Sequence, residues 1–173
     1  MASPEVHIDV ARQKLHLMLD GATERSYTVS TALNGMGEHN GSGCTPRGLH
    51  RVRAKVGAGC APGTVFVGRR ATGEVYSPEL AAAHPGRDWI LSRILWLTGC
   101  EPGINRGGAV DTLRRYIYIH GCPEDCPMGV PASHGCVRMT NADVIDLFDR
   151  VAVGTRVCIH STQTPWLMEG AAP

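Results

Sequence analysis

The sequence predicts a mostly β protein with one main α-helix. Its 173 residues include 21 glycines and 11 prolines, which indicate many turns and therefore many short elements. Several short segments alternate apolar and polar residues, which is the pattern of half-buried strands. Only one segment combines helical spacing of apolar residues with clear start and stop signals. A chain of this length suits one domain with a sizeable core, which we expect over residues 1–160, with a C-terminal tail at 161–173.

The first part of the chain predicts three strands. Apolar residues alternate from Val6 to Val10, and a second alternating segment runs from Leu15 to Leu19. Asp20-Gly21 is a hairpin turn signal, and Tyr27 and Val29 supply the returning strand.

The middle of the chain predicts further strands around two glycine-rich loops, at residues 30–48 and 98–110. Residues 49–56 alternate, with Val52, Ala54 and Val56 on one face and Arg51, Arg53 and Lys55 on the other. The remaining elements expected here are a strand at 64–67, one helical turn at 79–83 and a mostly apolar central strand at 89–97, buried on both faces.

The C-terminal part predicts the main helix between two strands, at 116–120 and 155–159. Thr140-Asn141-Ala142-Asp143 is a helix-capping signal, and Gly154 closes the element. Between them the apolar residues recur at helical spacing, at Val144, Leu147, Phe148 and Val151.

Charge and composition exclude some classes of partner and compartment. The 17 basic and 16 acidic residues give a formal charge of +1, which favours neither nucleic acid nor a membrane surface. No stretch approaches the roughly 18 apolar residues that cross a bilayer. Residues 1–9 lack the basic and apolar regions of a secretory signal, and the seven scattered cysteines fit reduced thiols. We therefore expect a cytoplasmic protein, or a periplasmic one if a leader has been removed.

Two short motifs contain the residues best suited to covalent catalysis, Ile119-His120-Gly121 and Ser133-His134-Gly135-Cys136-Val137-Arg138. A thiol becomes a good nucleophile when a histidine takes its proton and the thiolate–imidazolium pair persists. His120 lies at the end of a predicted strand, where a rigid element can hold a base in place. Gly135 lets the backbone bend tightly beside Cys136.

The side chains of His134 and Arg138 are the next candidates. In an extended segment, His134 and Cys136 share one face, and Arg138 follows on that face. His134 then orients Cys136, binds substrate or only fills the loop. Arg138 has the forked geometry of a carboxylate clamp, although a structural salt bridge explains it nearly as well.

The two motifs resemble the active-site signature of the YkuD-type L,D-transpeptidases. The resemblance covers nearly the whole chain, including the glycine-rich run 30–43 before Thr45-Pro46-Arg47-Gly48, the strand at 90–97, and Asn105-Arg106-Gly107-Gly108. It implies a sandwich-like β fold whose cleft holds the cysteine, with the main helix directly after the nucleophile. It also implies Cys136 as nucleophile, His120 as base, and an oxyanion hole made by the amides of Gly135 and Cys136, without a metal or organic cofactor.

The resemblance further implies a reaction on peptidoglycan. The scissile bond would join the L-centre of diaminopimelate to a terminal D-alanine in a tetrapeptide or muropeptide. Transfer to water makes the protein an L,D-carboxypeptidase of muropeptide recycling, whereas transfer to an amine makes it an L,D-transpeptidase. Reduced cysteines and the N-terminal residues favour the carboxypeptidase. Carbapenems are expected to add covalently to Cys136.

Several roles stay open at this level. Either the Ser133 hydroxyl or the Gly121 carbonyl orients His120. Asn105 and Arg106 bind substrate or belong to a solvated loop.

The cysteines near the motifs allow an alternative of another class. Cys122 stands where the family often has threonine, and Cys126 lies in the same loop. Together with His120, His134 and Cys136 they suggest a non-catalytic zinc or peptidoglycan-binding module. A Cys122–Cys126 disulfide or redox pair is a further alternative.

Overall fold

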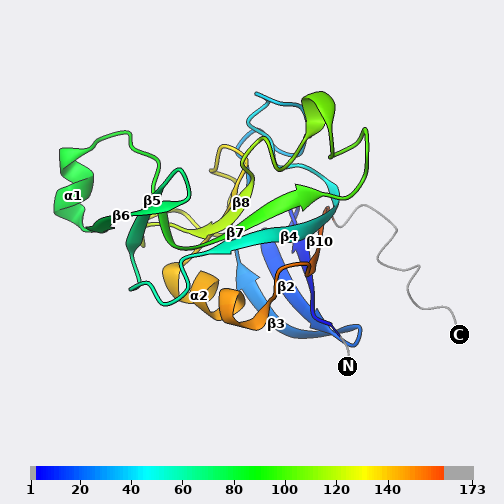
Figure 1. Ribbon diagram of the computed structural model, residues 1–173, viewed down its shortest axis with the longest axis horizontal. Coiled ribbons are helices and arrows are strands. Elements are labelled where there is room, and N and C mark those ends of the chain that lie inside the picture. Colours follow the sequence, from blue (N-terminus) through cyan, green and yellow to red (C-terminus); the bar gives the residue numbers. More distant parts are fainter. Residues whose placement is uncertain (1–2, 162–173) are drawn as a thin grey trace, which may run out of the picture.

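The computed structural model describes residues 3–161, which form one mixed β-sheet and two helices (Figure 1). The mostly β fold with one main helix is thereby confirmed. Of the tail predicted at 161–173, all residues after 161 lie outside the described part of the chain. The strands are β1 (Glu5–Asp9), β2 (Lys14–Leu19), β3 (Ala22–Thr28), β4 (Gly48–Val56), β5 (Thr64–Val67), β6 (Arg70–Val75), β7 (Ile90–Gly99), β8 (Tyr118–Gly121), β9 (Val137–Met139) and β10 (Arg156–His160). The helices are α1 (Pro78–Ala83) and α2 (Asn141–Arg150), and a 3₁₀ turn spans Gly108–Val110.

The sheet runs in the order β3-β2-β1-β10-β4-β7-β5-β6, with β8 paired to β7 and β9 paired to β8. The β1–β10 and β8–β9 pairs are parallel, and the other pairs are antiparallel. Ile94, Leu95 and Trp96 pair with β4 and also with β8, so these two strands lie on opposite edges of β7. The central position predicted for this strand is therefore confirmed.

The sheet curls back on itself at β9. Ser30, just after β3, exchanges two backbone hydrogen bonds with Arg138 of β9, at 2.9 and 2.8 Å. The segment after β3 thus lies beside β9, and the strands from β3 through β7 and β8 to β9 surround one apolar core.

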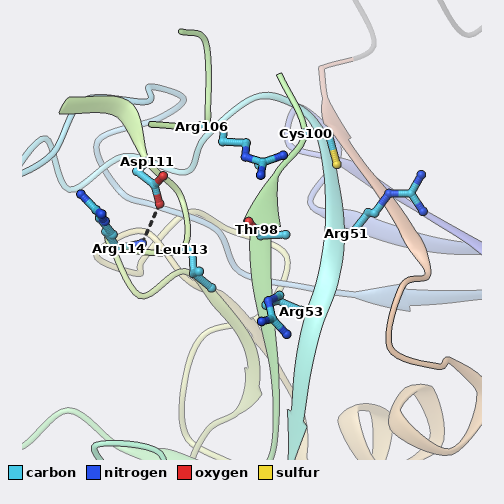
Figure 2. A pocket seen from close by; sticks show the side chains of 9 residues that line it. Arg51, Arg53, Thr98, Cys100, Arg106, Asp111, Leu113 and Arg114 are labelled. Atoms are coloured by element: carbon cyan, nitrogen blue, oxygen red, sulfur yellow. Dashed lines mark hydrogen bonds between the residues drawn. The ribbon is translucent and has the colours of Figure 1, made fainter. Parts of the chain in front are cut away.

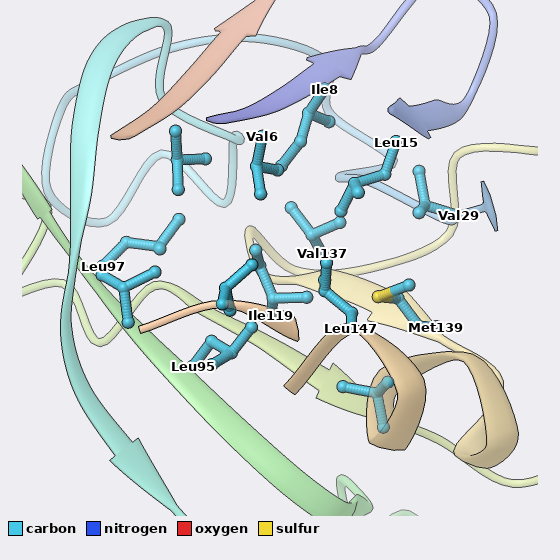
Figure 3. Packing of buried hydrophobic residues seen from close by; sticks show 14 of the residues in the cluster. Val6, Ile8, Leu15, Val29, Leu95, Leu97, Ile119, Val137, Met139 and Leu147 are labelled. Atoms are coloured by element: carbon cyan, nitrogen blue, oxygen red, sulfur yellow. The ribbon is translucent and has the colours of Figure 1, made fainter. Parts of the chain in front are cut away.

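The core fills the space between these strands and α2 (Figure 3). Alternation places one side chain in two on the inner face of each strand. Figure 3 labels Val6, Ile8, Leu15, Val29, Leu95, Leu97, Ile119, Val137, Met139 and Leu147, all of them 0% exposed. Full burial of each large aliphatic side chain contributes roughly 1.5–3 kcal/mol.

Helix α2 begins and packs as the sequence predicts. The Thr140 side chain accepts a hydrogen bond from the Asp143 N–H at 3.2 Å, and Val144, Leu147 and Phe148 are buried. Helix α1 is the short helical turn predicted around residues 79–83. Among residues 3–161, neither helix has the length and apolarity needed to span a membrane.

The predicted faces of β4 are wrong beyond Val52. A bulge shifts the register there, because Val52 pairs with Leu97 but Ala54 already pairs with Trp96. The alternation therefore reverses: Val52 packs in the main core, whereas Val56 packs in a second cluster on the other face. Lys55 instead turns toward α2.

Strand β6 is not predicted at all. Its sequence is polar and mostly exposed, so it carries no alternation of apolar residues. Tyr116 was expected in the same strand as His120, but it adopts a positive φ of 56° and lies before β8.

Candidate active site

The pairing of β8 with β9 gathers the candidate catalytic side chains on one face of the sheet. In this parallel pair Ile119 lies opposite Val137, and both are fully buried in the main core. Because neighbouring residues in a strand point to opposite faces, His120 and Arg138 point away from that core. Tyr118 and Cys136 do so as well, and both belong to the second apolar cluster. The prediction that Cys136 and Arg138 share a face is confirmed.

The sulfur of Cys136 contacts two backbone groups. The Tyr118 N–H donates to Sγ at 3.3 Å, and the thiol donates to the Tyr116 carbonyl oxygen at 3.4 Å. Burial raises the pKa of the Cys136 thiol to about 11, although the Tyr118 N–H opposes this shift by stabilising the thiolate. The resting sulfur is therefore protonated at neutral pH.

The ring of His120 is held by the neighbouring backbone. Its Nδ1 lies 2.7 Å from the Gly121 carbonyl oxygen, and the side chain is 1% exposed. A carbonyl oxygen only accepts hydrogen bonds, so Nδ1 carries the hydrogen and Nε2 keeps a lone pair for proton abstraction. The Gly121 carbonyl, and not the Ser133 hydroxyl, therefore orients His120.

Burial also lowers the pKa of His120. Together with the raised pKa of Cys136, this shift favours a neutral thiol and a neutral imidazole. Both shifts act against the thiolate–imidazolium pair expected from the sequence. Nε2 is suited to take the thiol proton as the sulfur attacks.

Gly121 is required by close packing around its Cα. A Cβ at this position would lie 2.6 Å from the Leu91 carbonyl oxygen and 2.7 Å from Asn141 Oδ1. Asn141 in turn donates to the Cys122 carbonyl oxygen at 3.2 Å and accepts from the Ser92 hydroxyl at 2.6 Å. These contacts fix the backbone whose carbonyl orients His120.

Ser133 holds the loop that carries the nucleophile. Its hydroxyl donates to the Cys136 carbonyl oxygen at 2.6 Å and accepts from the Gly135 N–H at 3.2 Å. Gly135 has φ = 137°, and a Cβ there would lie 3.2 Å from the Cys44 carbonyl oxygen. The Gly135 N–H can therefore donate to an oxyanion, as predicted, only when its hydrogen bond to the Ser133 hydroxyl is broken.

The expected placement of His134 is wrong. The chain bends at His134, Gly135 and Cys136, so the segment that leads to Cys136 is not extended. His134 is exposed on this bend.

Arg138 makes the structural contacts that were the alternative to a substrate clamp. Its Nη2 lies 3.3 Å from Asp88 Oδ1, and its Nη1 donates to the Ala132 carbonyl oxygen at 3.4 Å. Both terminal nitrogens of the Arg138 guanidinium thus already contact other groups of the protein.

Asn105 has a structural role in place of the predicted substrate contact. It is fully buried, and its amide donates at 3.0 Å to the carbonyl oxygens of Arg47 and Leu49. Its Oδ1 accepts from the Glu101 N–H at 2.9 Å. Asn105 thereby joins the loop after β7 to the start of β4, and no polar atom is left for a ligand.

Arg106 is exposed and lines a separate cavity of about 570 Å³ (Figure 2). Arg51 and Arg53 of β4 and Arg114 border the same cavity. Neither Cys136 nor His120 borders it, so Arg106 does not contact the nucleophile in this structure.

Arg115 was not predicted from the sequence, and it secures the glycine-rich segment beside the nucleophile. Its Nη2 donates to the Cys44 carbonyl oxygen at 2.6 Å, and its Nη1 donates to the Gly37 carbonyl oxygen at 3.2 Å. No local sequence signal marks this residue. Tyr118 was also missed, although its place two residues before His120 in one strand puts both on the same face.

The cysteines are all free thiols in this structure. Cys122 is buried and donates to the Met139 carbonyl oxygen at 3.3 Å, and burial raises its pKa. Within residues 3–161, no three His, Cys, Asp or Glu side chains are grouped so that they could hold a metal ion. The zinc alternative therefore finds no support in this part of the chain.

The family model of the YkuD domain, described as the L,D-transpeptidase catalytic domain, matches residues 3–168. The chain belongs to the YkuD family. A curated relative is the protein named "Probable L,D-transpeptidase YbiS" of Escherichia coli, which is 49% identical over 43 residues. That match covers 25% of this chain and only 14% of the relative's length.

Solved structures of proteins named L,D-transpeptidases share the fold. An L,D-transpeptidase from Mycobacterium smegmatis aligns with a TM-score of 0.57 and 20% identity, over 92% of this chain and 59% of the other. The L,D-transpeptidase LdtMt1 in complex with imipenem aligns with a TM-score of 0.54 and 15% identity, over 92% of this chain and 59% of the other. The expected YkuD-type fold is confirmed.

Proposed function

We propose that this YkuD-family protein is a cysteine-dependent L,D-carboxypeptidase that releases terminal D-alanine from peptidoglycan tetrapeptides. The observation that carries the acyl-transfer chemistry is the common face of Cys136 and His120, with the His120 tautomer set by the Gly121 carbonyl. Family membership supports peptidoglycan as the substrate class.

Acylation begins with attack by the Cys136 sulfur on the carbonyl carbon of the scissile peptide bond. His120 Nε2 accepts the thiol proton as the C–S bond forms, and negative charge develops on the carbonyl oxygen. The Cys136 amide, joined by the Gly135 amide when its contact with Ser133 opens, donates to that oxygen. As the C–N bond breaks, His120 gives its proton to the departing amine of D-alanine.

Deacylation uses the same base. His120 Nε2 takes a proton from water while the water oxygen attacks the thioester carbonyl. The C–S bond then breaks, and the thiol regains its proton. The chemistry needs no metal or organic cofactor.

The choice of water as acceptor rests on the cysteines. All seven are unpaired, which fits a reducing compartment and a cytoplasmic role in muropeptide recycling. The second candidate, an L,D-transpeptidase that passes the acyl group to an amine, is favoured by the description of the family and of YbiS.

One experiment separates the two candidates. The protein is incubated with a disaccharide tetrapeptide, alone and with an added amine acceptor, and the products are read by mass spectrometry. The carboxypeptidase yields tripeptide and D-alanine in both reactions. A product joined to the amine as the main species would make the protein a transpeptidase, and no cysteine-dependent change would favour a non-catalytic binding module.

A further inference from the structure

The guanidinium of Arg69 is fixed beside the nucleophile by three aromatic side chains. Arg69 lies in the turn between β5 and β6, and its guanidinium carbon is 4.7 Å from the Trp96 ring centre and 4.9 Å from that of Tyr116. Its Nη1 also donates to the Tyr118 hydroxyl at 3.0 Å. Such cation–π contacts and a hydrogen bond hold the planar fork in one orientation.

The residues that hold Arg69 also contact the reacting sulfur. Tyr116 and Tyr118 touch Arg69 with their side chains, and their backbones make both hydrogen bonds to Cys136 Sγ. Trp96 lies opposite Tyr118 in the β7–β8 pair, and both side chains pack in the cluster that includes Cys136. Arg69 is therefore one aromatic side chain away from the nucleophile.

Arg69 is held in place by these aromatic side chains and not by a counterion. Arg47, Arg87 and Arg138 each lie within 3.3 Å of a carboxylate oxygen. No carboxylate among residues 3–161 forms an ion pair with Arg69, and its hydrogen-bond partner is a neutral phenol. Tyr116, which lies against it, is 53% exposed, so solutes reach this position.

A fixed and partly exposed guanidinium without a counterion is suited to a carboxylate, which can accept two parallel hydrogen bonds from it. Its place relative to His120 decides which carboxylate. The base must protonate the departing amine, so the leaving residue lies on the His120 side of the sulfur. Tyr118, the first residue of β8, and Tyr116 just before the strand contact the sulfur, whereas His120 lies two residues further along β8. Arg69 therefore faces the acyl-donor side.

We propose that Arg69 forms a carboxylate subsite that recognises the free carboxylate on the acyl-donor residue of the stem peptide. This inference rests on the proposed function. In a diaminopimelate residue cleaved at its L-centre, that group is the carboxylate of the D-centre.

The test uses four tetrapeptides, in which the D-centre carboxylate and the D-alanine carboxylate are each either free or amidated. Wild type, Arg69→Gln and Arg69→Lys are compared, with Arg70→Gln as the matched control because Arg70 is its exposed neighbour in the hairpin. A charge-assisted hydrogen bond predicts a KM for Arg69→Gln that is raised roughly tenfold to a hundredfold on peptides with the free D-centre carboxylate. On peptides amidated there, Arg69→Gln should equal wild type, and Arg69→Lys should be intermediate on the free ones.

Circular dichroism and thermal unfolding check that each variant is folded. The ratio of the KM values on amidated and free peptides removes any effect of a variant that is equal on all peptides. An equal loss on all four peptides, or a loss that follows the D-alanine carboxylate, would overturn the subsite and leave the proposed function standing. Absence of cysteine-dependent turnover by the wild type would overturn both.

Discussion

His120 is buried and Cys136 is half-buried, and the loss of solvent around each group stabilises its neutral form. The preference for a neutral pair means that the proton moves during attack and not before it. The histidine must therefore be placed accurately, which is the role of the Gly121 carbonyl at 2.7 Å from Nδ1.

Replacing either residue should abolish turnover. We expect Cys136→Ala and His120→Ala to lose at least about a thousandfold in kcat on the tetrapeptide, because each removes a participant in covalent catalysis. His134→Ala should retain more activity, since His134 is exposed on a bend. Steady-state release of D-alanine measures the activity of the three variants. If His134→Ala is less active than His120→Ala, the assignment of His120 as the base is wrong.

The pH profile should distinguish the neutral pair from a preformed ion pair. The pKa of His120 is lowered from 6.5, so the imidazole is a base above that lowered value and kcat/KM should fall as pH drops through it. The thiol stays protonated up to a pKa of about 11, so no further rise is expected between about pH 7 and pH 10. Initial rates across this range test the expectation, and a tenfold rise per pH unit would show that a preformed thiolate is required.

At the scale of elements, the link from β9 to α2 connects the nucleophile to the rest of the fold. Thr140 follows β9 directly and caps the helix, and Asn141 at its first turn reaches the loop after His120. A change in this cap therefore acts on the support of both catalytic strands.

Thr140→Ala should lower the free energy of unfolding by about 1 kcal/mol, because it removes the hydrogen bond to the Asp143 N–H. For a domain of this size, the midpoint temperature of thermal unfolding should fall by roughly 2–4 °C. Asp149→Ala is the control, since Asp149 is exposed on the same helix and should change stability by less than about 0.5 kcal/mol. Denaturant and thermal unfolding measure both, and equal effects would mean that the cap contributes nothing.

Periodicity was sufficient to predict the elements that bury one face, such as β1, β2 and α2. It failed at β6, where an exposed strand needs no apolar residues, and at β4, where the bulge reverses the faces. Motif resemblance identified Cys136 and His120 as candidates. Asn105 shows the limit, because its buried contacts with Arg47 and Leu49 join segments far apart in the sequence.

At the scale of the whole molecule, the seven thiols differ in their exposure, and Cys136 lies on the same face as the proposed base His120. A carbapenem should therefore form one covalent adduct per chain. Intact-mass measurement after mixing should show a single addition that is absent from Cys136→Ala. An adduct that persists in this variant would point to Cys122 or Cys126.

The parallel pairing of β1 with β10 also has a consequence for biosynthesis. β10 lies between β1 and β4 in the sheet, yet among residues 3–161 it is the last strand to be synthesised. Until then β1 and β4 each present an unpaired edge, and such edges invite association with other chains. The sheet therefore cannot be completed until β10 has been synthesised, and we expect chains that lack β10 to associate more readily than the full sheet.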